Sequence, residues 1–110
     1  MSRVGRLLNT TAEVWRATTE DDGGGGQSTT WALQSTQRAR LSQPSARERQ
    51  AADQSSADLT HIVYLTPGVD VRRKDELRRD GLVLEVTATF EPSEPGTYLR
   101  ADCTARQPTS

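Results

Sequence analysis

The chain has 110 residues, too few to divide into two hydrophobic cores, so we expect a single domain spanning residues 1–110. Only 33% of the residues are hydrophobic and the mean hydropathy is −0.73, a composition that predicts a thin core stabilised in part by neighbouring subunits. Fourteen Lys and Arg against fifteen Asp and Glu leave a net charge of −1, which argues against a dedicated nucleic-acid binder, because such proteins carry a basic excess.

The single cysteine, Cys103, excludes an internal disulfide and favours an intracellular protein. The Leu7-Leu8 pair is far shorter than the ~7–15 apolar residues of a signal-peptide core. No stretch reaches the ~18 apolar residues of a membrane helix. We therefore expect a soluble, unprocessed chain without membrane contact.

The first predicted hairpin joins a strand at residues 11–19 to a second strand at residues 28–41. The connection, residues 20–27, is acidic and contains four consecutive glycines, which predicts a flexible loop rather than a tight turn. A phosphate-binding loop is disfavoured, because neither a Lys-Ser/Thr pair nor a GxGxxG context accompanies the glycines.

Tryptophans occur on both strands of this hairpin. Strict alternation in the second strand places Thr29, Trp31, Leu33 and Ser35 on one face. Trp15 and Trp31 are predicted to pair across the hairpin and anchor the core. The alternative is that one of them caps an interface, since aromatic residues are common at binding hot spots.

A long excursion, residues 42–59, follows the second strand. Pro44 cannot lie inside a strand, and residues 46–52 form a strong helix-forming run after Ser45, a suitable N-cap. Alanines are the only apolar residues of this run, so a helix here is expected to pack lightly on the rest of the domain or to await a partner surface.

The second half of the chain is rich in strand signals. Residues 60–66 combine β-branched and aromatic residues and end at Pro67-Gly68, which predicts a central strand. Asp80-Gly81 predicts a type I′ hairpin turn between arms at residues 75–78 and 82–90. In the second arm, alternation predicts one buried face; its residues are Leu82, Leu84, Val86, Ala88 and Phe90.

A last strand is predicted at residues 97–105, and the tail at 107–110 is expected to fray. Together these signals predict a mainly β fold, a small antiparallel β-barrel or sandwich of five or six strands interrupted by one long loop or short helix.

No constellation of catalytic, cofactor-binding or metal-ligating residues is visible. His61 is the only histidine, and no cysteine near it in sequence completes a metal-ligand set. A Cys–His hydrolase built on His61 and Cys103 is an alternative, but it requires an activated thiolate in a cleft. Cys103 is expected instead to be a small buried core residue. We predict a non-enzymatic protein without cofactors.

Two basic groups stand out. Residues 72–74 and the nearby Arg78 and Arg79 alternate with four acidic residues, a pattern typical of surface or intersubunit ion pairs. The second group surrounds the excursion and would form a positive collar in a ring; it consists of Arg38, Arg40, Arg47 and Arg49. A second hypothesis is a monomeric nucleic-acid-binding barrel in which Trp15, Trp31 and Tyr64 stack on bases beside the arginines.

The segment from Trp31 to Gln107 resembles the head-closure proteins, or stoppers, of long-tailed bacteriophages. The shared order is a tryptophan strand, "RARLSQPSARERQAADQ", "THIVYL", "DVRRKDELRRDGLVLEVTATFEP" and "TYLRADC". The family often has glycine at the position of Lys74, so the chain departs from the pattern there. The adaptor and tail-terminator proteins of neighbouring rings are alternatives within the same structural class.

The resemblance implies a structural virion protein that assembles in the host bacterial cytoplasm. It implies a homo-oligomeric ring below the portal and adaptor and above the tail terminator or tail tube, through which packaged DNA passes without sequence-specific binding. On this basis the candidate interface or lumen residues are Arg38, Arg40, Arg47, Glu48, Arg49, Gln50 and Gln54. The candidate ring or tail contacts are Arg72, Arg73, Lys74, Asp75, Gly23, Gly24, Gly25 and Gly26.

Overall fold

The computed structural model describes residues 8–21, 23–54, 59–91 and 98–106. It confirms a mainly β fold with six antiparallel strands and one short helix in the described residues. The elements are β1 (Thr10–Asp21), β2 (Gln27–Ser42), α2 (Ala46–Gln54), β3 (His61–Leu65), β4 (Glu76–Arg79), β5 (Leu82–Phe90) and β6 (Leu99–Arg106). The tail at 107–110 and the predicted strand start at Thr97 lie outside the described residues.

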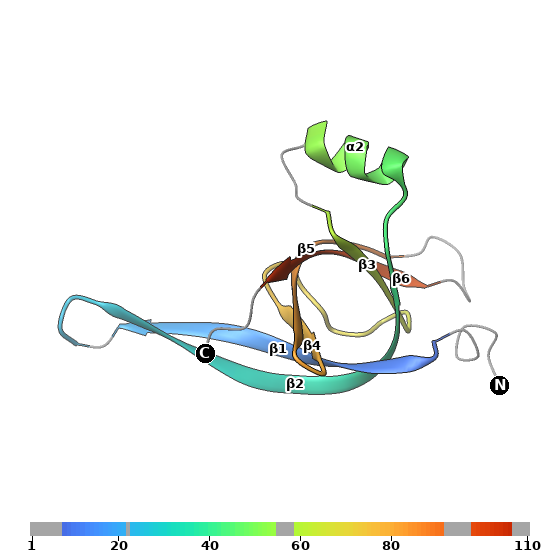
Figure 1. Cartoon of the computed structure of the whole chain (residues 1–110). Coiled ribbons are helices and arrows are strands. Elements are labelled where there is room, and N and C mark those ends of the chain that lie inside the picture. Colours follow the sequence, from blue (N-terminus) through green and yellow to red (C-terminus); the bar gives the residue numbers. More distant parts are fainter. Residues whose placement is uncertain (1–7, 22, 55–58, 92–97, 107–110) are drawn as a thin grey trace.

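The six strands form one sheet that closes on itself in the order β1-β2-β3-β6-β5-β4 (Figure 1). Closure comes from a short antiparallel pairing of β1 with β4, in which Val14 lies opposite Leu77. β3 pairs with both β2 and β6, so the prediction of a central strand at this position is confirmed. The closed sheet leaves strand edges unpaired only where a strand extends beyond its neighbours.

The core fills the inside of the closed sheet with small and branched side chains. Its buried members are Ala12, Val14, Ala39, Val63, Leu65, Val71, Leu77, Leu84, Val86, Leu99, Ala101 and Cys103. No aromatic ring belongs to this cluster, as expected from the low hydrophobic content. The predicted inward alternation of β6 is confirmed, because Leu99, Ala101 and Cys103 are all buried.

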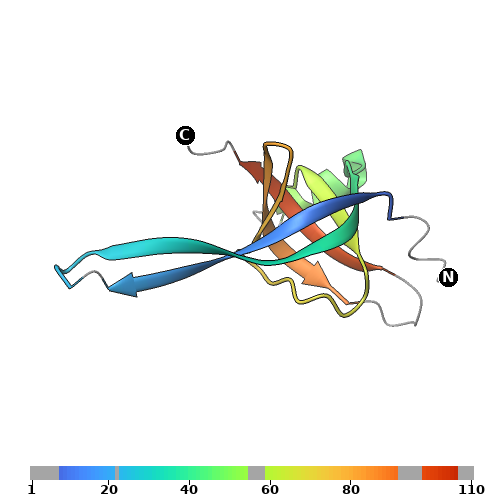
Figure 2. The ribbon, with the colours of Figure 1, turned by 90° about the horizontal axis from the view of Figure 1, so that it is seen from below.

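A long hairpin arm projects from the closed sheet (Figures 1 and 2). We define the arm as residues 16–21 and 27–32, which pair from Arg16 opposite Ala32 to Asp21 opposite Gln27. Pairing up to these last two residues makes the predicted loop at 20–27 shorter, so only residues 22–26 connect the strands. Gly23 and Gly25 adopt φ angles of +82° and +87°, a backbone conformation that favours glycine.

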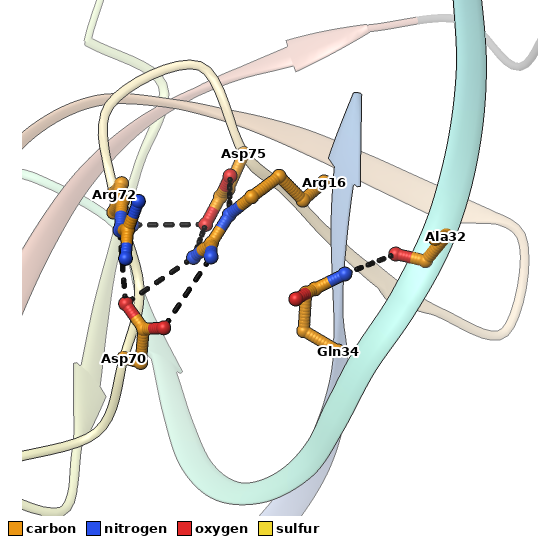
Figure 3. Close-up of polar contacts among 6 residues, drawn as sticks. All are labelled: Arg16, Ala32, Gln34, Asp70, Arg72 and Asp75. Carbon is orange, nitrogen blue, oxygen red and sulfur yellow. Dashed lines mark hydrogen bonds and ion pairs between the residues drawn. The ribbon is translucent and has the colours of Figure 1, made fainter. Parts of the chain in front are cut away.

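A β-bulge in β2 changes the predicted pattern of faces. Val14 lies opposite Ser35 and Trp15 lies opposite Leu33, which leaves Gln34 unopposed. The bulge moves Ser35 to the face of Val14, so the prediction that Ser35 shares a face with Leu33 is wrong. The side-chain nitrogen Nε2 of Gln34 donates to the carbonyl oxygen of Ala32 at 3.2 Å (Figure 3).

A second bulge corrects the predicted buried face of β5. Val86 lies opposite Cys103 and Ala88 lies opposite Asp102, so Thr87 is the extra residue. The hydroxyl of Thr87 donates to the carbonyl oxygen of Asp102 at 3.1 Å. Beyond this point the faces exchange, and Phe90, which was predicted to be buried, is 52% exposed.

The two tryptophans do not anchor the core, contrary to prediction. Trp15 lies opposite Leu33 and Trp31 opposite Ala17, and both indole rings are half-buried on the outer surface. The guanidinium carbon of Arg78 lies 4.5 Å from the ring centroid of Trp15 and 5.3 Å from that of Trp31. The rings therefore contact a cation rather than the hydrophobic core.

Two turns carry positive φ angles at residues other than glycine. The predicted Asp80-Gly81 turn is confirmed, with φ of 47° and 84°, the signs that a type I′ turn requires. Lys74 has a φ of 79°. This conformation explains physically why glycine suits the position at which the chain departs from the head-closure pattern.

The predicted helix of the excursion is confirmed as α2, and Ser45 caps it. The backbone nitrogen of Glu48 donates to the hydroxyl of Ser45 at 3.2 Å, and the backbone nitrogen of Ser45 donates to a carboxylate oxygen of Glu48 at 2.9 Å. This reciprocal pair is a capping box. No helix in the described residues is long and apolar enough to cross a membrane.

Candidate functional site

The base of the arm is held by a network of two arginines and two aspartates (Figure 3). Nε of Arg16 donates to Oδ1 of Asp75 at 3.0 Å, and Nη2 donates to Oδ2 at 2.9 Å. The same guanidinium contacts both carboxylate oxygens of Asp70 at 3.3 Å. Nε of Arg72 donates to Asp70 at 3.1 Å. The network joins β1, where the arm begins, to the loop before β4.

Burial makes Asp75 the centre of this network. Its relative exposure is 3%, and Oδ2 also accepts a hydrogen bond from the backbone nitrogen of Arg72 at 2.9 Å. Hydrogen bonds to Asp75 and Asp70 raise the pKa of Arg16, and the hydrogen bonds from Arg16 and Arg72 lower the pKa of Asp70. Because the Asp75 carboxylate accepts hydrogen bonds from both Arg16 and Arg72, it fixes the direction in which the arm leaves the sheet.

A second charged group supports the outer side of the arm. Glu76 is buried and accepts from Nε of Arg78 at 2.9 Å and from Nη1 of Arg106 at 3.0 Å. Arg78 is the residue that lies against Trp15 and Trp31. Glu76 therefore orients the guanidinium that links the closed sheet to the tryptophans at the arm's base.

The first group of predicted interface residues is spread over β2 and α2. Arg38 and Arg40 flank the buried Ala39, so both side chains lie on the outer face of β2 and are exposed. Nη2 of Arg38 donates to the carbonyl oxygen of Leu8 at 3.0 Å. Three further residues, Arg47, Arg49 and Gln50, are exposed on α2. Gln54 lies in α2, but its side chain is outside the described residues.

Glu48, the remaining member of that group, ties α2 to the sheet. Its carboxylate lies 3.2 Å from Nη1 of Arg100 on β6. Hydrogen bonds from Ser45, followed by the charge of Arg100, lower the pKa of Glu48. Glu48 therefore has a structural role within the subunit, as a cap and as an anchor for the helix.

The second group of predicted contacts lies at the two ends of the arm. Arg72, Arg73 and Lys74 are exposed near its base, whereas Asp75 is buried against Arg16. The four glycines, Gly23, Gly24, Gly25 and Gly26, are exposed at its tip. The structure thus keeps the glycines and the basic run apart.

Sequence reasoning did not identify Arg16, Glu76 or Arg100 as organising residues. Arg16 and Asp75 are 59 residues apart, and only the strand register brings them together. The one available signal was the acidic residues interleaved with the arginines, which predicted ion pairs but not their partners.

His61 and Cys103 are direct partners across β3 and β6, yet the pair lacks the chemistry of a hydrolase. Cys103 is fully buried, and desolvation raises the pKa of its thiol to about 12. The thiol donates to the carbonyl oxygen of Ala101 at 3.6 Å. A protonated, inaccessible thiol is not a nucleophile near neutral pH. Among the residues the structure describes, no group of three potential ligands could hold a metal ion.

Fold and surface define a class: a small closed β-sheet domain that carries a projecting hairpin arm. Comparison with known proteins narrows this class. Residues 5–106 match the family described as phage head completion protein, so the chain belongs to that family. The resemblance to head-closure proteins is thereby confirmed, and a structural role in the phage head, associated with the virion, follows from it. A structural family also fits the prediction of a non-enzymatic protein.

One solved structure supports the fold. Protein SF1141 from Shigella flexneri 2a is similar with a TM-score of 0.73 and 18% sequence identity, over 90% of this chain and 93% of that chain. No curated protein matches the sequence.

Proposed function

We propose that the chain is a subunit of a homo-oligomeric ring in the phage neck, placed below the portal and adaptor and above the tail terminator or tail tube. The ring continues the DNA channel, retains packaged DNA and provides the surface on which the tail docks. The observation that carries this proposal is the arm, since it extends beyond the closed sheet with no other described strand beside it.

An isolated two-stranded ribbon is marginally stable in water. The arm is nevertheless built on a base fixed by Arg16, Asp75 and Asp70, which sets its direction before any partner arrives. Such an element suits contact with a neighbouring subunit, and the closed sheet offers few other edges.

The charge of the chain supports passage rather than binding of DNA. A net charge of −1 gives little phosphate neutralisation, so DNA can slide through the channel. We assign the excursion, residues 42–59, to contact with a neighbour or the channel lumen, and the glycine tip of the arm to contact with the adaptor or tail.

The experiment for this proposal is phage assembly without the protein, followed by electron microscopy and a titre of infectious particles. We expect DNA-filled or leaking heads beside free tails, and restoration by the wild-type gene supplied in trans. Complete infectious particles formed without the protein would refute the proposal. Locating the subunit in an image of the intact neck separates head closure from the adaptor and tail-terminator alternatives.

Deletion of residues 45–57 tests the role assigned to the excursion. We expect a folded protein, shown by a cooperative thermal transition, that fails to restore DNA retention or assembly. A control variant, Ala51→Ser, keeps the excursion and is expected to restore both. An unchanged titre for the deletion would contradict the assignment.

The nucleic-acid-binding alternative is weakened by the tryptophan geometry. Arg78 lies against both indole rings, so the rings are not a free stacking platform. That alternative requires salt-dependent binding of oligonucleotides, and we expect no mobility shift at low salt.

A further inference from the structure

The outer edges of the arm are available for strand addition. β4 pairs with β1 only at Glu13–Trp15, and β3 pairs with β2 only at Ala39–Ser42. Residues 27–37 of β2 carry no charged side chain, and Leu33 within them is 48% exposed. An uncharged strand edge with few protective features is a template for pairing with another strand.

Charges that no ion pair neutralises lie at opposite ends of the β1–β2 hairpin, on β1 at the arm's tip and on β2 beyond the arm's base. At the arm's tip, Glu20 and Asp21 are exposed and form no ion pair with a cation in the described part of the chain. At the other end, Arg38 and Arg40 have no carboxylate partner among the described residues. The eleven residue steps from position 27 to position 38 span roughly 36 Å of strand. The two groups therefore cannot meet within one subunit.

We propose that the arm of one copy docks on a second copy of this chain, with Glu20 and Asp21 facing Arg38 and Arg40 of its neighbour. The inference rests on the ring proposed above and names the contact that builds it. A second copy is the occupant because one chain carries both halves of a complementary pair. When the outer edge of β1 in the arm docks on the β2 edge of the neighbour, the two surfaces differ, so the contact is head-to-tail and generates a ring when its rotation closes.

Each part of the contact has a separate physical role. The free edge of β2 supplies backbone hydrogen bonds, which give affinity without sequence specificity. The acidic tip and the two arginines select the direction and register of the added strand, because the reversed arrangement would place like charges together. Their attraction weakens with salt, so docking is salt-sensitive.

A cross-linking experiment on assembled particles tests the geometry. The variant with both Glu20→Cys and Arg40→Cys is supplied to phage that lack their own copy, and the necks are treated with a short bismaleimide. We expect a ladder of covalent multimers, because each copy then carries both reactive positions. Each single variant is the matched control and should stay monomeric; Cys103 is buried and does not react.

Charge exchange tests the electrostatics. In the full-length chain, E20K/D21K and R38E/R40E should each abolish assembly when supplied alone, whereas an equal mixture of the two should restore it. When the two variants alternate, the residues at positions 20 and 21 of each copy face residues of opposite charge at positions 38 and 40 of the next copy. Exchanging Glu91 to Lys, at an exposed acidic position outside the contact, should leave assembly unchanged. Failure of the mixture to restore what both single exchanges abolish would overturn the assigned pairing.

The outcomes separate this inference from the proposed function. If infectious particles contain the double-cysteine protein in their necks but give no ladder, the docking is overturned and the proposed function stands. Complete particles formed without the protein overturn the proposed function instead. In that case the docking is tested separately, by cross-linking the purified double-cysteine variant at high concentration. Multimers would support the docking, and monomers would refute it.

Discussion

Arg16 and Asp75 form a two-pronged ion pair, with Nε to Oδ1 at 3.0 Å and Nη2 to Oδ2 at 2.9 Å, between residues 59 positions apart. Asp75 is 3% exposed, so removing its cation leaves a buried carboxylate. Arg16→Ala is therefore expected to lower the free energy of unfolding by about 3 kcal/mol, measured by urea denaturation. Arg72→Ala breaks only an exposed pair with Asp70 and should cost no more than about 1 kcal/mol. Equal losses in the two variants would contradict the central role of Asp75.

The bulge at Thr87 makes a prediction about two residues of one strand. Before the bulge Leu84 is buried, and after it Phe90 is exposed. Leu84→Ala should lower the free energy of unfolding by about 2–5 kcal/mol. Phe90→Ser should lower it by no more than about 1 kcal/mol, because it loses only a surface contact with the Arg100 guanidinium, 5.7 Å from its ring, and no core contact. Comparable losses would show that the strand keeps one alternation throughout.

Lys74 provides a test of backbone strain. Its φ of 79° is costly for a residue with a Cβ, and its backbone nitrogen donates to Val86, a hydrogen bond that glycine retains. Lys74→Gly is expected to raise the free energy of unfolding by about 0.5–1 kcal/mol, measured as a higher melting temperature. Arg73→Gly, at a position without positive φ, should not stabilise the protein. Stabilisation by both substitutions would point to charge removal instead.

Glu48 predicts a pH dependence of stability. Its pKa is lowered below the usual 4.5, first by hydrogen bonds from Ser45 and then by Arg100. A carboxylate with a lowered folded-state pKa stabilises the fold above its unfolded pKa, and that contribution is lost as the pH falls through the lowered value. Wild type should therefore be more stable than Glu48→Gln at pH 7, and the difference should vanish in acid. Glu20→Gln, at the exposed tip, should follow the wild-type profile; a Glu48→Gln difference that persists in acid would contradict the prediction.

Cys103 predicts an inert thiol. With a pKa of about 12, only about one thiol in ten thousand is ionised at pH 8, and the side chain is also inaccessible. A thiol-reactive probe should leave the native protein unlabelled and label it stoichiometrically in denaturant. Rapid labelling of the native chain would revive the hydrolase hypothesis.

Local signals predicted the parts of the fold that depend on local chemistry. Asp80-Gly81 specified its hairpin turn, and Ser45 specified the start of α2, because both act through the backbone of adjacent residues. The long-range features could not be predicted in this way. Gln34 and Thr87 have no bulge signature, yet each exchanges the faces of its strand, and this exchange misplaced Ser35 and Phe90.

The tryptophans show the same limit at the candidate site. The low content of large apolar residues predicted Trp15 and Trp31 in the core, but both rings instead contact the guanidinium of Arg78 from β4 on the outer surface. The Arg78 side chain reaches them only because β1 and β4 close the sheet. The basic group of exposed arginines on β2 and α2 could be recognised in the sequence. The partners of Arg16 could not, because the strand register brings them together.

The free edge of β2 also has a consequence for the subunit before assembly. Residues 27–37 form an uncharged segment without proline or glycine. Natural proteins usually interrupt such edges with charges, and here the nearest charge along the strand is Arg38. An unassembled pool of this protein is thus open to edge-to-edge pairing between copies, and synthesis in step with consumption by growing particles would keep that pool small.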